Sequence, residues 1–388
     1  GEDLTDLIVE ELLEAAATFP NETGLGWDQI HPKAITRLPR QLLELLVRIL
    51  IECEQTGVWP DNVALVLIAL LPKTDGGYRP IGLLPFLARL WMRARRQAAT
   101  KWEAKNAKPY LYAGKSKGAN VAAWKQSALA ELASTLGFKI EYAQALLDLV
   151  KAFDRVPHWL LVREAIELGY PLRQLRLSLA TYLLSRVIRI KQVASKTVVA
   201  MRGITAGSGF ATTEMRLVFI RIIDRALKFF PSVRPTLFVD DLSAEIIAHE
   251  DLAVQELGGF IELVAEYIKD TGQELSSTKS VCTSSSNSLG NKLSARWTNL
   301  GIAFQKRVKS LGVGLGAGVR RNVTVQKDRL KAYGKRLMQF RKLKKAGVST
   351  ARLLRTGLRA MTYGLAAMGV SDSMLGAQRT TAAAVAAP

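Results

Sequence analysis

Two adjacent carboxylates, Asp240 and Asp241, lie between an apolar run that ends at Val239 and another that begins at Leu242. Neighbouring side chains of a strand point to opposite faces, so two acids can serve one site only where the chain turns. The pattern therefore predicts a β-hairpin with both carboxylates at its tip. The alternative is an Asp-Asp pair that merely caps a surface turn.

A third carboxylate, Asp148, ends the apolar run Ala145-Leu-Leu-Asp-Leu-Val. Three converging carboxylates are a suitable ligand set for two Mg²⁺ ions, with Mn²⁺ as an alternative, and such a pair supports phosphoryl chemistry. We expect Asp148 and Asp240 to bridge the ions and Asp241 to assist them or to hold the turn. Asp154 lies beyond Lys151, outside the apolar run, and is expected to be structural.

The composition indicates a folded protein with an anionic partner. The chain has 388 residues, of which 48% are hydrophobic, enough for a sizeable core and two or three subdomains. Lys and Arg number 54 against 34 Asp and Glu, a formal charge of +20, and no run of about 18 apolar residues suggests a membrane span. Nucleic acid is therefore the expected partner, and a ribosomal or histone-like role stays open.

Two further features concern where the protein works. Cys53 and Cys282 belong to no metal-spaced cluster, which argues against a zinc finger or disulfide framework and favours a reducing compartment. The start, Gly1-Glu-Asp, carries no charged-then-apolar leader. We therefore expect no secretory signal, and an origin as a piece of a longer product.

The elements that must position these acids follow from hydrophobic periodicity. Helices are predicted over residues 3–18, 40–54, 119–137, 159–168, 172–184, 212–229 and 252–271. Strands or hairpins are predicted over 63–71 with the apolar run after its turn, 143–150, 186–200, both flanks of the Asp240-Asp241 turn, and 309–316. A loop is expected over 276–288 and a disordered end over Thr380–Pro388. Strands that alternate with helices indicate an α+β core.

The segment 326–345 has the pattern of an amphipathic helix with a cationic face. Leu330, Tyr333, Leu337 and Phe340 recur at steps of three and four residues. The cations that we expect to bind nucleic-acid phosphates are Lys331, Lys335, Arg336, Arg341 and Lys342. A merely solvated cationic face is the alternative.

Six segments, in order, resemble the reverse transcriptases of non-long-terminal-repeat (LINE-type) retrotransposons and, more distantly, of group II introns. They are Leu71-Pro-Lys-Thr-Asp-Gly-Gly-Tyr-Arg-Pro-Ile, Leu147-Asp-Leu-Val-Lys-Ala-Phe-Asp-Arg-Val-Pro-His, Gly203-Ile-Thr-Ala-Gly-Ser-Gly-Phe, Phe238-Val-Asp-Asp, Leu275-Ser-Ser-Thr-Lys-Ser and Ser310-Leu-Gly-Val. The resemblance implies an α+β right-hand polymerase. Fingers with an N-terminal helical region would occupy 1–140, a palm of antiparallel sheet plus helices 141–315, and a basic helical thumb with its disordered tail 316–388.

The same resemblance implies roles at the nucleotide. Lys73 and Arg79 flank a Gly-Gly turn that can lay cationic donors over a triphosphate, although Lys73 is equally well a solvated loop lysine. Phe153 resembles the aromatic gate beneath the sugar, with a core aromatic as the alternative. Gly207 belongs to a loop that supports the template base and the nucleotide. Lys279 resembles a lysine that protonates the leaving pyrophosphate, and a solvated loop lysine is the alternative.

The chain departs from the family pattern at one loop. The usual form has Gln where Ala206 stands and Ser-Pro where the chain reads Ala211-Thr-Thr. Loss of the amide removes hydrogen bonds, which keeps open a catalytically degenerate or non-enzymatic, maturase-like RNA-binding protein. RNA-dependent RNA synthesis is disfavoured by the bulk of Phe153.

The resulting hypothesis is an RNA-directed DNA polymerase (reverse transcriptase) of a retroelement. The expected partners are an RNA template, a DNA primer or target and deoxynucleoside triphosphates, with no membrane. The resemblance alone implies an intracellular location, in the nucleus, the cytoplasm or both.

Overall fold

The computed structural model describes residues 4–73, 76–114, 117–137, 139–190, 193–317, 321–351, 353–356, 363–369 and 371–386. The chain forms two compact units that interleave along the sequence. Unit 1 comprises Gly1–Lys108, Val150–Asp224 and Tyr267–Glu274, and unit 2 comprises Pro109–Leu149, Arg225–Glu266 and Leu275–Pro388. The domain boundaries that the sequence predicts, after residues 140 and 315, stay a prediction.

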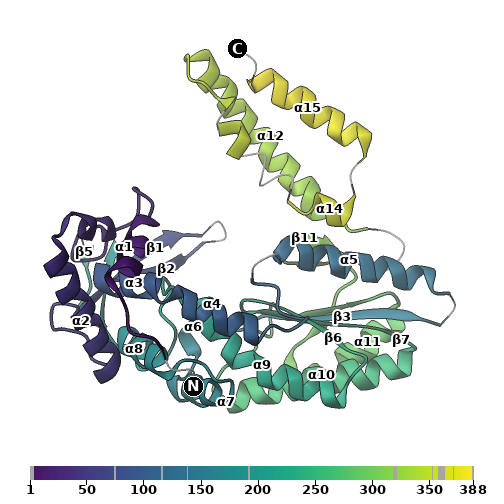
Figure 1. Ribbon diagram of the computed structural model, residues 1–388. Helices are drawn as coiled ribbons and strands as arrows, with labels where there is room; N and C mark the ends of the chain where they lie inside the picture. The colour runs from purple at the N-terminus through teal and green to yellow at the C-terminus, as the bar shows by residue number, and fades with distance from the viewer. Residues whose placement is uncertain are drawn as a thin grey trace. The chain divides into compact units, whose positions relative to one another are not determined.

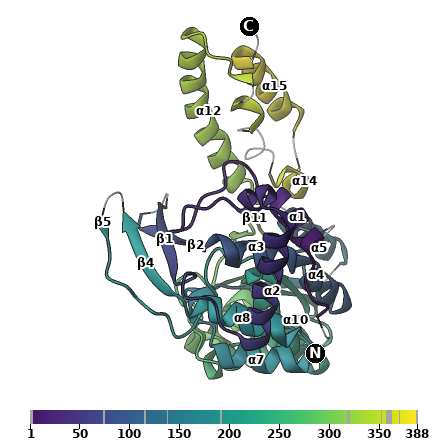
Figure 2. The same ribbon diagram turned by 60° about the vertical axis from the view of Figure 1, so that its left-hand side comes forward.

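Unit 1 combines a bundle of helices with a four-stranded sheet of order β2-β1-β4-β5 (Figure 2). The strands are β1 (Leu65–Pro72), β2 (Tyr78–Leu83), β4 (Ser185–Ile190) and β5 (Val193–Ala194). The helices are α1 (Val9–Ala17), η1 (Pro32–Arg37), α2 (Arg40–Thr56), α3 (Phe86–Ala94), α4 (Arg96–Lys105), α6 (Ala152–Arg155), α7 (His158–Glu167) and α8 (Leu172–Tyr182). β1 pairs antiparallel with β2 and parallel with β4, so this sheet is mixed.

The core of unit 1 surrounds Trp91 on α3, which is fully buried. Its ring meets Trp59 edge-on at a centroid distance of 5.7 Å and Phe210 at 5.4 Å. Edge-to-face pairs of this kind stabilise beyond the area they bury. Phe210 ends the glycine loop that contains Gly207, so this loop is attached directly to the core.

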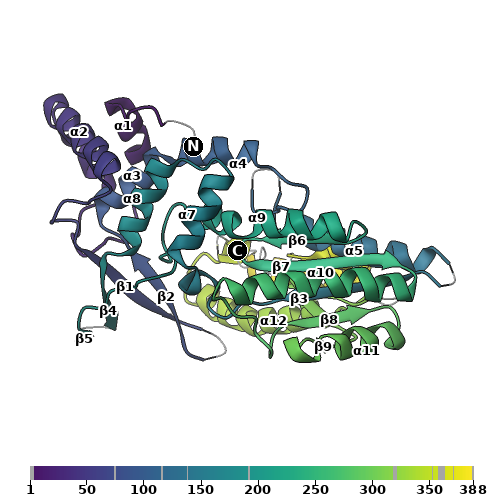
Figure 3. The ribbon, with the colours of Figure 1, turned by 90° about the horizontal axis from the view of Figure 1, so that it is seen from below.

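Unit 2 contains a five-stranded sheet of order β6-β7-β3-β8-β9 (Figure 3). The strands are β3 (Glu141–Leu147), β6 (Arg234–Phe238), β7 (Asp241–Ala248), β8 (Val281–Ser284) and β9 (Ala303–Phe304). The neighbours pair antiparallel except β8 and β9, which are parallel. The α+β class, with antiparallel and mixed sheets, is therefore confirmed.

Helices cover both faces of this sheet (Figures 1 and 3). The helix α5 (Ala119–Thr135) lies on one face, and α10 (Glu250–Asp270) and α11 (Asn287–Arg296) lie on the other. The helix α9 (Ala211–Phe229) runs from unit 1 into unit 2. The remaining elements within the described residues of unit 2 are η2 (Thr298–Leu300), β10 (Val308–Ser310), β11 (Val313–Leu315), α12 (Thr324–Lys345), α14 (Leu365–Met368) and α15 (Asp372–Ala386).

Two expectations at the C-terminal side are wrong. The predicted loop 276–288 contains β8. Its residues Ser284 and Cys282 pair with Ala143 and Ala145 of β3. The predicted disordered end forms the last turns of α15 as far as Ala386. Alanine is the strongest helix former, and Val385 is fully buried, so local propensity and packing agree on a helix. Residues 387 and 388 lie outside the described residues.

The amphipathic pattern of residues 326–345 is confirmed by α12. Leu337 is buried with Leu354 and Val385, and Leu330 and Phe340 pack against them. The side chain of Tyr333 lies outside the described residues. Figure 1 shows α15 alongside α12. No helix in the described part of the chain is long and apolar enough to span a membrane.

Candidate functional site

The predicted acidic hairpin is present at the end of β6 and β7. Phe238 pairs with Asp241, which leaves Val239 and Asp240 at the tip. Val239 has a φ of 63°, which is rare for a β-branched residue and costs about 1–3 kcal/mol. The turn is thus held in a strained form that sets the direction of both carboxylates.

Asp148 reaches the same edge of the sheet through strand register. It follows the last residue of β3, Leu147, whose partner on β7 is Leu242. The backbone of Asp148 is fixed on its other side, because its N–H donates to Ser280 Oγ at 3.1 Å and its carbonyl accepts from the Ser276 N–H at 2.8 Å. β3 and β7 therefore bring Asp148 beside Asp241 although the two are far apart in sequence.

Asp148 and Asp241 both line a cavity of about 110 Å³. Lys279, Lys309 and Ser310 are also part of its wall, and Asp240 is not among the described lining residues. The Nζ of Lys279 lies 3.6 Å from Asp148 Oδ2, where it partly balances the negative charge. The cavity is thus a small polar space with acids and lysines on its walls.

The three carboxylates influence one another electrostatically. Although the side chain of Asp241 keeps contact with solvent, partial loss of hydration and, secondarily, the charges of Asp240 and Asp148 together raise its pKa to about 6. Like charges held together disfavour ionisation, and a cation between them removes that penalty. Carboxylate oxygens are also the donors that Mg²⁺ and Mn²⁺ prefer.

The donor chemistry fits a divalent metal, but the present arrangement does not complete a site. In the part of the chain that the structure describes, no three His, Cys, Asp or Glu side chains are grouped so that they could hold a metal ion. The predicted ligand set Asp148, Asp240 and Asp241 therefore stays a prediction. A metal ion bound by Asp148 Oδ2 would compete with Lys279 for that oxygen.

In unit 1, the β1–β2 hairpin carries the two predicted triphosphate cations. Leu71 pairs with Arg79, and the Lys73 N–H donates to the Gly77 carbonyl at 3.1 Å. Gly76 and Gly77 have φ values of 91° and 77°, which a glycine pair allows. Lys73 and Arg79 are both exposed near this turn, and Thr74 and Asp75 lie outside the described residues.

The loop 203–210 contacts both this hairpin and the segment of Phe153. The Gly82 N–H on β2 donates to the Ala206 carbonyl at 2.6 Å, and the Ile204 N–H donates to the Phe153 carbonyl at 2.8 Å. Gly207 has a φ of 114°, and a Cβ there would lie 2.1 Å from the Gly82 carbonyl oxygen. The close backbone approach explains why Gly82 and Gly207 are glycines. It also connects the β1–β2 hairpin, the loop 203–210 and the segment of Phe153, which are all predicted to bind the nucleotide.

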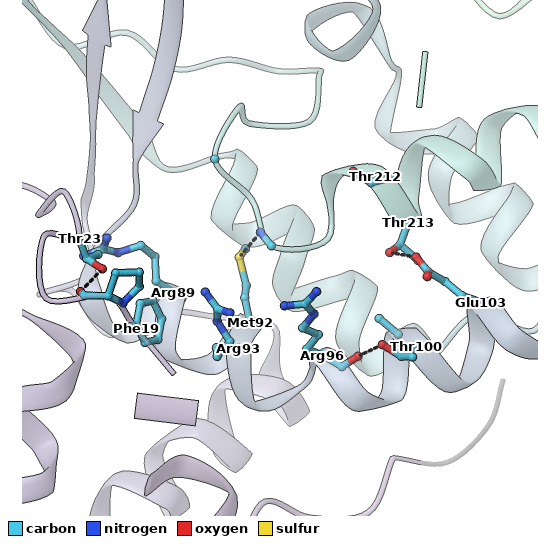
Figure 4. A pocket seen from close by; sticks show the side chains of 14 residues that line it. Phe19, Thr23, Arg89, Met92, Arg93, Arg96, Thr100, Glu103, Thr212 and Thr213 are labelled. Carbon is cyan, nitrogen blue, oxygen red and sulfur yellow. Dashed lines mark hydrogen bonds between the residues drawn. The ribbon is translucent and has the colours of Figure 1, made fainter. Parts of the chain in front are cut away.

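A basic pocket of about 570 Å³ lies beside this loop in unit 1 (Figure 4). Three of its lining residues are Arg89, Arg93 and Arg96. Burial and, secondarily, the charge of Arg96 lower the pKa of Arg93 from its ordinary value. Such like charges around one cavity favour an anion.

The acidic side chain in this pocket is already paired. Glu103 Oε1 accepts from Thr213 Oγ1 at 2.6 Å, and its Oε2 lies 3.1 Å from Arg216 Nη1. The wall also includes Gly207 and Gly209 of the glycine loop. The pocket therefore presents a net positive lining directly behind that loop.

A family model described as "Reverse transcriptase (RNA-dependent DNA polymerase)" matches residues 71–315. The chain belongs to the reverse transcriptase family. This family, whose model is described as an RNA-dependent DNA polymerase, is the one that the six sequence segments predicted. Members of the family use divalent metal ions.

A search of curated proteins gives no match to this reverse transcriptase. Among solved structures, it is similar to apo telomerase from Candida tropicalis truncated from the C-terminal domain, with 10% identity and a TM-score of 0.47. The match covers 76% of this chain and 62% of the telomerase chain, so this reverse transcriptase spans less than two thirds of that protein.

Sequence reasoning missed the arginines of the basic pocket of this reverse transcriptase. Arg89, Arg93 and Arg96 follow one another at steps of four and three residues, the spacing of one helix face. That spacing is the sequence feature from which a shared cationic face could have been predicted. The five predicted cations of α12 are all exposed, namely Lys331, Lys335, Arg336, Arg341 and Lys342.

Proposed function

We propose that this reverse transcriptase extends a primer 3′-hydroxyl on an RNA template, as the polymerase of a non-long-terminal-repeat retroelement. The observation that carries the proposal is the β3–β7 register, which brings Asp148 beside Asp241 on an edge whose hairpin tip holds Asp240. All three acids lie within the stretch matched by the family model. The six family-like segments in their order support the retroelement type.

Asp148 and Asp240 are proposed as bridging ligands of two Mg²⁺ ions, with Asp241 assisting. Bound there, the ions would stabilise the attacking and leaving oxygens of the transfer. Lys279, 3.6 Å from Asp148, would then be released toward the leaving pyrophosphate, where an ammonium can donate a proton. Removal of the ions by a chelator is expected to abolish extension.

Nucleotide binding is assigned to unit 1. Lys73 and Arg79, exposed near the β1–β2 turn, are proposed to contact the triphosphate. Phe153, partly buried and fixed through its carbonyl to the glycine loop, is proposed to reject a 2′-hydroxyl. Gly207, whose close approach to the Gly82 carbonyl leaves no room for a Cβ, is proposed to support the templating base and the nucleotide.

We assign the right-hand layout in the same way: fingers over 1–140, palm over 141–315 and thumb from 316. The exposed cations of α12 would follow the backbone of a primer–template duplex without sequence preference. The arginine pocket of unit 1 adds a second cationic surface for the nucleic acid. RNA template, DNA primer and deoxynucleotides are therefore the proposed partners.

The deciding experiment is extension of an oligo-primed RNA template with deoxynucleotides and Mg²⁺, with wild type and Asp240→Ala run together. Product from the wild type alone supports the proposal. Intact RNA binding without product from either protein would contradict it.

That second outcome would favour the other candidate, a catalytically degenerate RNA-binding protein. One observation supports it: Ala206 contributes a backbone hydrogen bond to Gly82 but has no side-chain amide of the kind that the usual family residue, Gln, would place there. Binding of Mg²⁺ that depends on Asp148 separates the two candidates, because an RNA-binding scaffold has no use for the ion.

RNA synthesis on an RNA template is the third candidate. A bulky gate at Phe153 argues against it, since the ring would occupy the space of a ribonucleotide 2′-hydroxyl. We expect Phe153→Ala to raise the relative kcat/KM for ribonucleotides about tenfold or more. Equal use of both nucleotide types by the wild type would contradict the DNA assignment.

A further inference from the structure

A buried carboxylate lies behind the glycine loop of unit 1. Glu214, on the first turn of α9, is fully buried. Its Oε1 accepts from Ser178 Oγ at 2.6 Å, and its Oε2 accepts from the Tyr182 hydroxyl. Burial raises the pKa of Glu214 to about 7, although both hydrogen bonds lower it. Burial of a carboxyl group this deep costs free energy, which only hydrogen bonds such as these two offset.

The hydrogen bonds continue from Glu214 to the loop. The Tyr182 hydroxyl on α8 lies 2.8 Å from Ser208 Oγ, and Ser208 Oγ accepts from the Phe210 N–H at 3.1 Å. Tyr182 is itself fully buried. Tyr182 of α8 thus contacts Ser208, the residue that follows Gly207, and Glu214 of α9 is connected to Ser208 through Tyr182.

The other side of Gly207 is fixed independently. The Ala206 carbonyl accepts from the Gly82 N–H at 2.6 Å, and Thr205 Oγ1 accepts from Arg186 Nη2 at 2.9 Å. Gly207 itself stands at a left-handed φ of 114°. With alanine at position 206, the loop has no amide side chain there to hold its own shape. The contacts from α8 and α9 therefore complete the fixation on the Ser208 side.

We propose that Tyr182 and Glu214 are positioning residues for nucleotide selection, which act through Ser208 to fix the Gly207 loop. This inference rests on the proposed function for the role of the loop, whereas the mechanical link from Glu214 to Ser208 stands without it. An apolar pair at these positions would pack as well, but Ser208 Oγ would lose its bond to Tyr182 and keep only the Phe210 N–H and Met92 Sδ, so the loop would be held less firmly.

The first test is Tyr182→Phe, which removes one hydroxyl and keeps the ring. A neutral hydrogen bond contributes about 0.5–1.5 kcal/mol, so we expect KM for deoxynucleotides to rise about three- to tenfold while kcat changes less than about twofold. Misincorporation should rise with it. The chain offers a matched control in Tyr170, equally buried, whose hydroxyl accepts from Gln174 Nε2 at 2.7 Å.

Tyr170→Phe loses a buried hydroxyl of the same kind without touching the loop, so its thermal stability should fall similarly and its KM should stay at the wild-type value. If both variants change KM equally, Tyr182 is merely structural and the inference is overturned. Glu214→Gln keeps an oxygen acceptor for Tyr182 and should give a KM between those of wild type and Glu214→Leu. No difference between the two Glu214 variants would likewise contradict it.

A second readout does not depend on activity. Amide hydrogen exchange at Ser208 and Phe210 should accelerate in Tyr182→Phe and stay unchanged in Tyr170→Phe, because only the first variant releases Ser208 Oγ. If the protein does not polymerise, the proposed function fails while this measurement still decides the link to the loop. Unchanged exchange in Tyr182→Phe would overturn the inference.

Discussion

The candidate acids of unit 2 and the glycine loop of unit 1 are positioned in opposite ways. Asp148, Asp240 and Asp241 sit at the ends of regular strands, where pairing of β3, β6 and β7 fixes their backbone. The loop 203–210 belongs to no regular element and is held by separate contacts from β2, β4, α3, α6 and α8. A site on strands depends on register, whereas a site on a loop depends on every partner around it.

The two regions also differ in charge. The acids of unit 2 lie in or near a small cavity, with lysines as the opposing charges. In unit 1, the pocket beside the glycine loop is lined by Arg89, Arg93 and Arg96. The acidic region thus suits cations and the basic region suits phosphates, the two charge types that nucleotidyl transfer requires.

The largest effect should come from the acids. We expect Asp148→Asn to reduce primer extension roughly 10³- to 10⁴-fold, because a lost metal ligand removes several kcal/mol of transition-state stabilisation. The matched control is Asp154→Asn, an exposed acid a short distance along the same segment. Single-turnover extension measures both, and equal losses would mean that strand register does not select the catalytic acid.

The next effect concerns the buried pair that supports unit 1. Arg95, 4% exposed, donates through Nε and Nη2 to the two Glu54 oxygens at 2.5 Å each. Arg95→Ala leaves the buried Glu54 with only the Trp91 Nε1–H at 2.7 Å and Arg173 Nη2 at 3.4 Å, so the free energy of unfolding should fall by about 3–5 kcal/mol. The exposed pair Arg321–Glu131 of unit 2 is the control, and Arg321→Ala should cost at most about 1 kcal/mol. Urea titration measures the free energy of unfolding of both variants. Similar losses in the two would contradict the expected difference between the buried and the exposed pair.

A smaller effect is expected from the loop glycine. Gly207→Ala forces a Cβ against the Gly82 carbonyl at a left-handed φ, which should cost about 1–3 kcal/mol and raise KM for deoxynucleotides. Gly76→Ala is the control, since its φ of 91° is also left-handed but no atom lies within 4 Å of the added Cβ. Stability and steady-state kinetics of the two variants separate crowding from backbone strain. A normal KM in Gly207→Ala would show that the loop tolerates displacement.

The smallest effect should come from α12. Lys335→Ala combined with Arg336→Ala removes two exposed cations, so the slope of log K against log salt for a duplex should become less steep by about 0.9 per lost phosphate contact. The control is Arg40→Ala combined with Arg48→Ala, two exposed cations of α2 in unit 1. Fluorescence anisotropy over a salt series measures both. Equal slopes in both variants would show that duplex binding is a property of net charge alone.

Several local features could be read from the sequence with good accuracy. The helix predicted over 119–137 is Ala119–Thr135, and the acidic hairpin and the short pair near 309–316 are present. Their patterns are short-range, set by apolar period and by turn residues. The strand β8 was missed because Val281-Cys-Thr-Ser lies in a serine-rich stretch whose burial depends on β3.

The sequence by itself determined the family, the order of its motifs, the cationic face of α12 and the candidate acids. Only the tertiary structure decided which edge Asp148 shares with Asp241, that three arginines line one pocket, and that Glu214 is buried behind the loop. The reason is physical: side-chain type and local period are properties of neighbours in the chain. Register and burial are set by partners far away, and a strand shifted by one residue would turn every side chain to the other face.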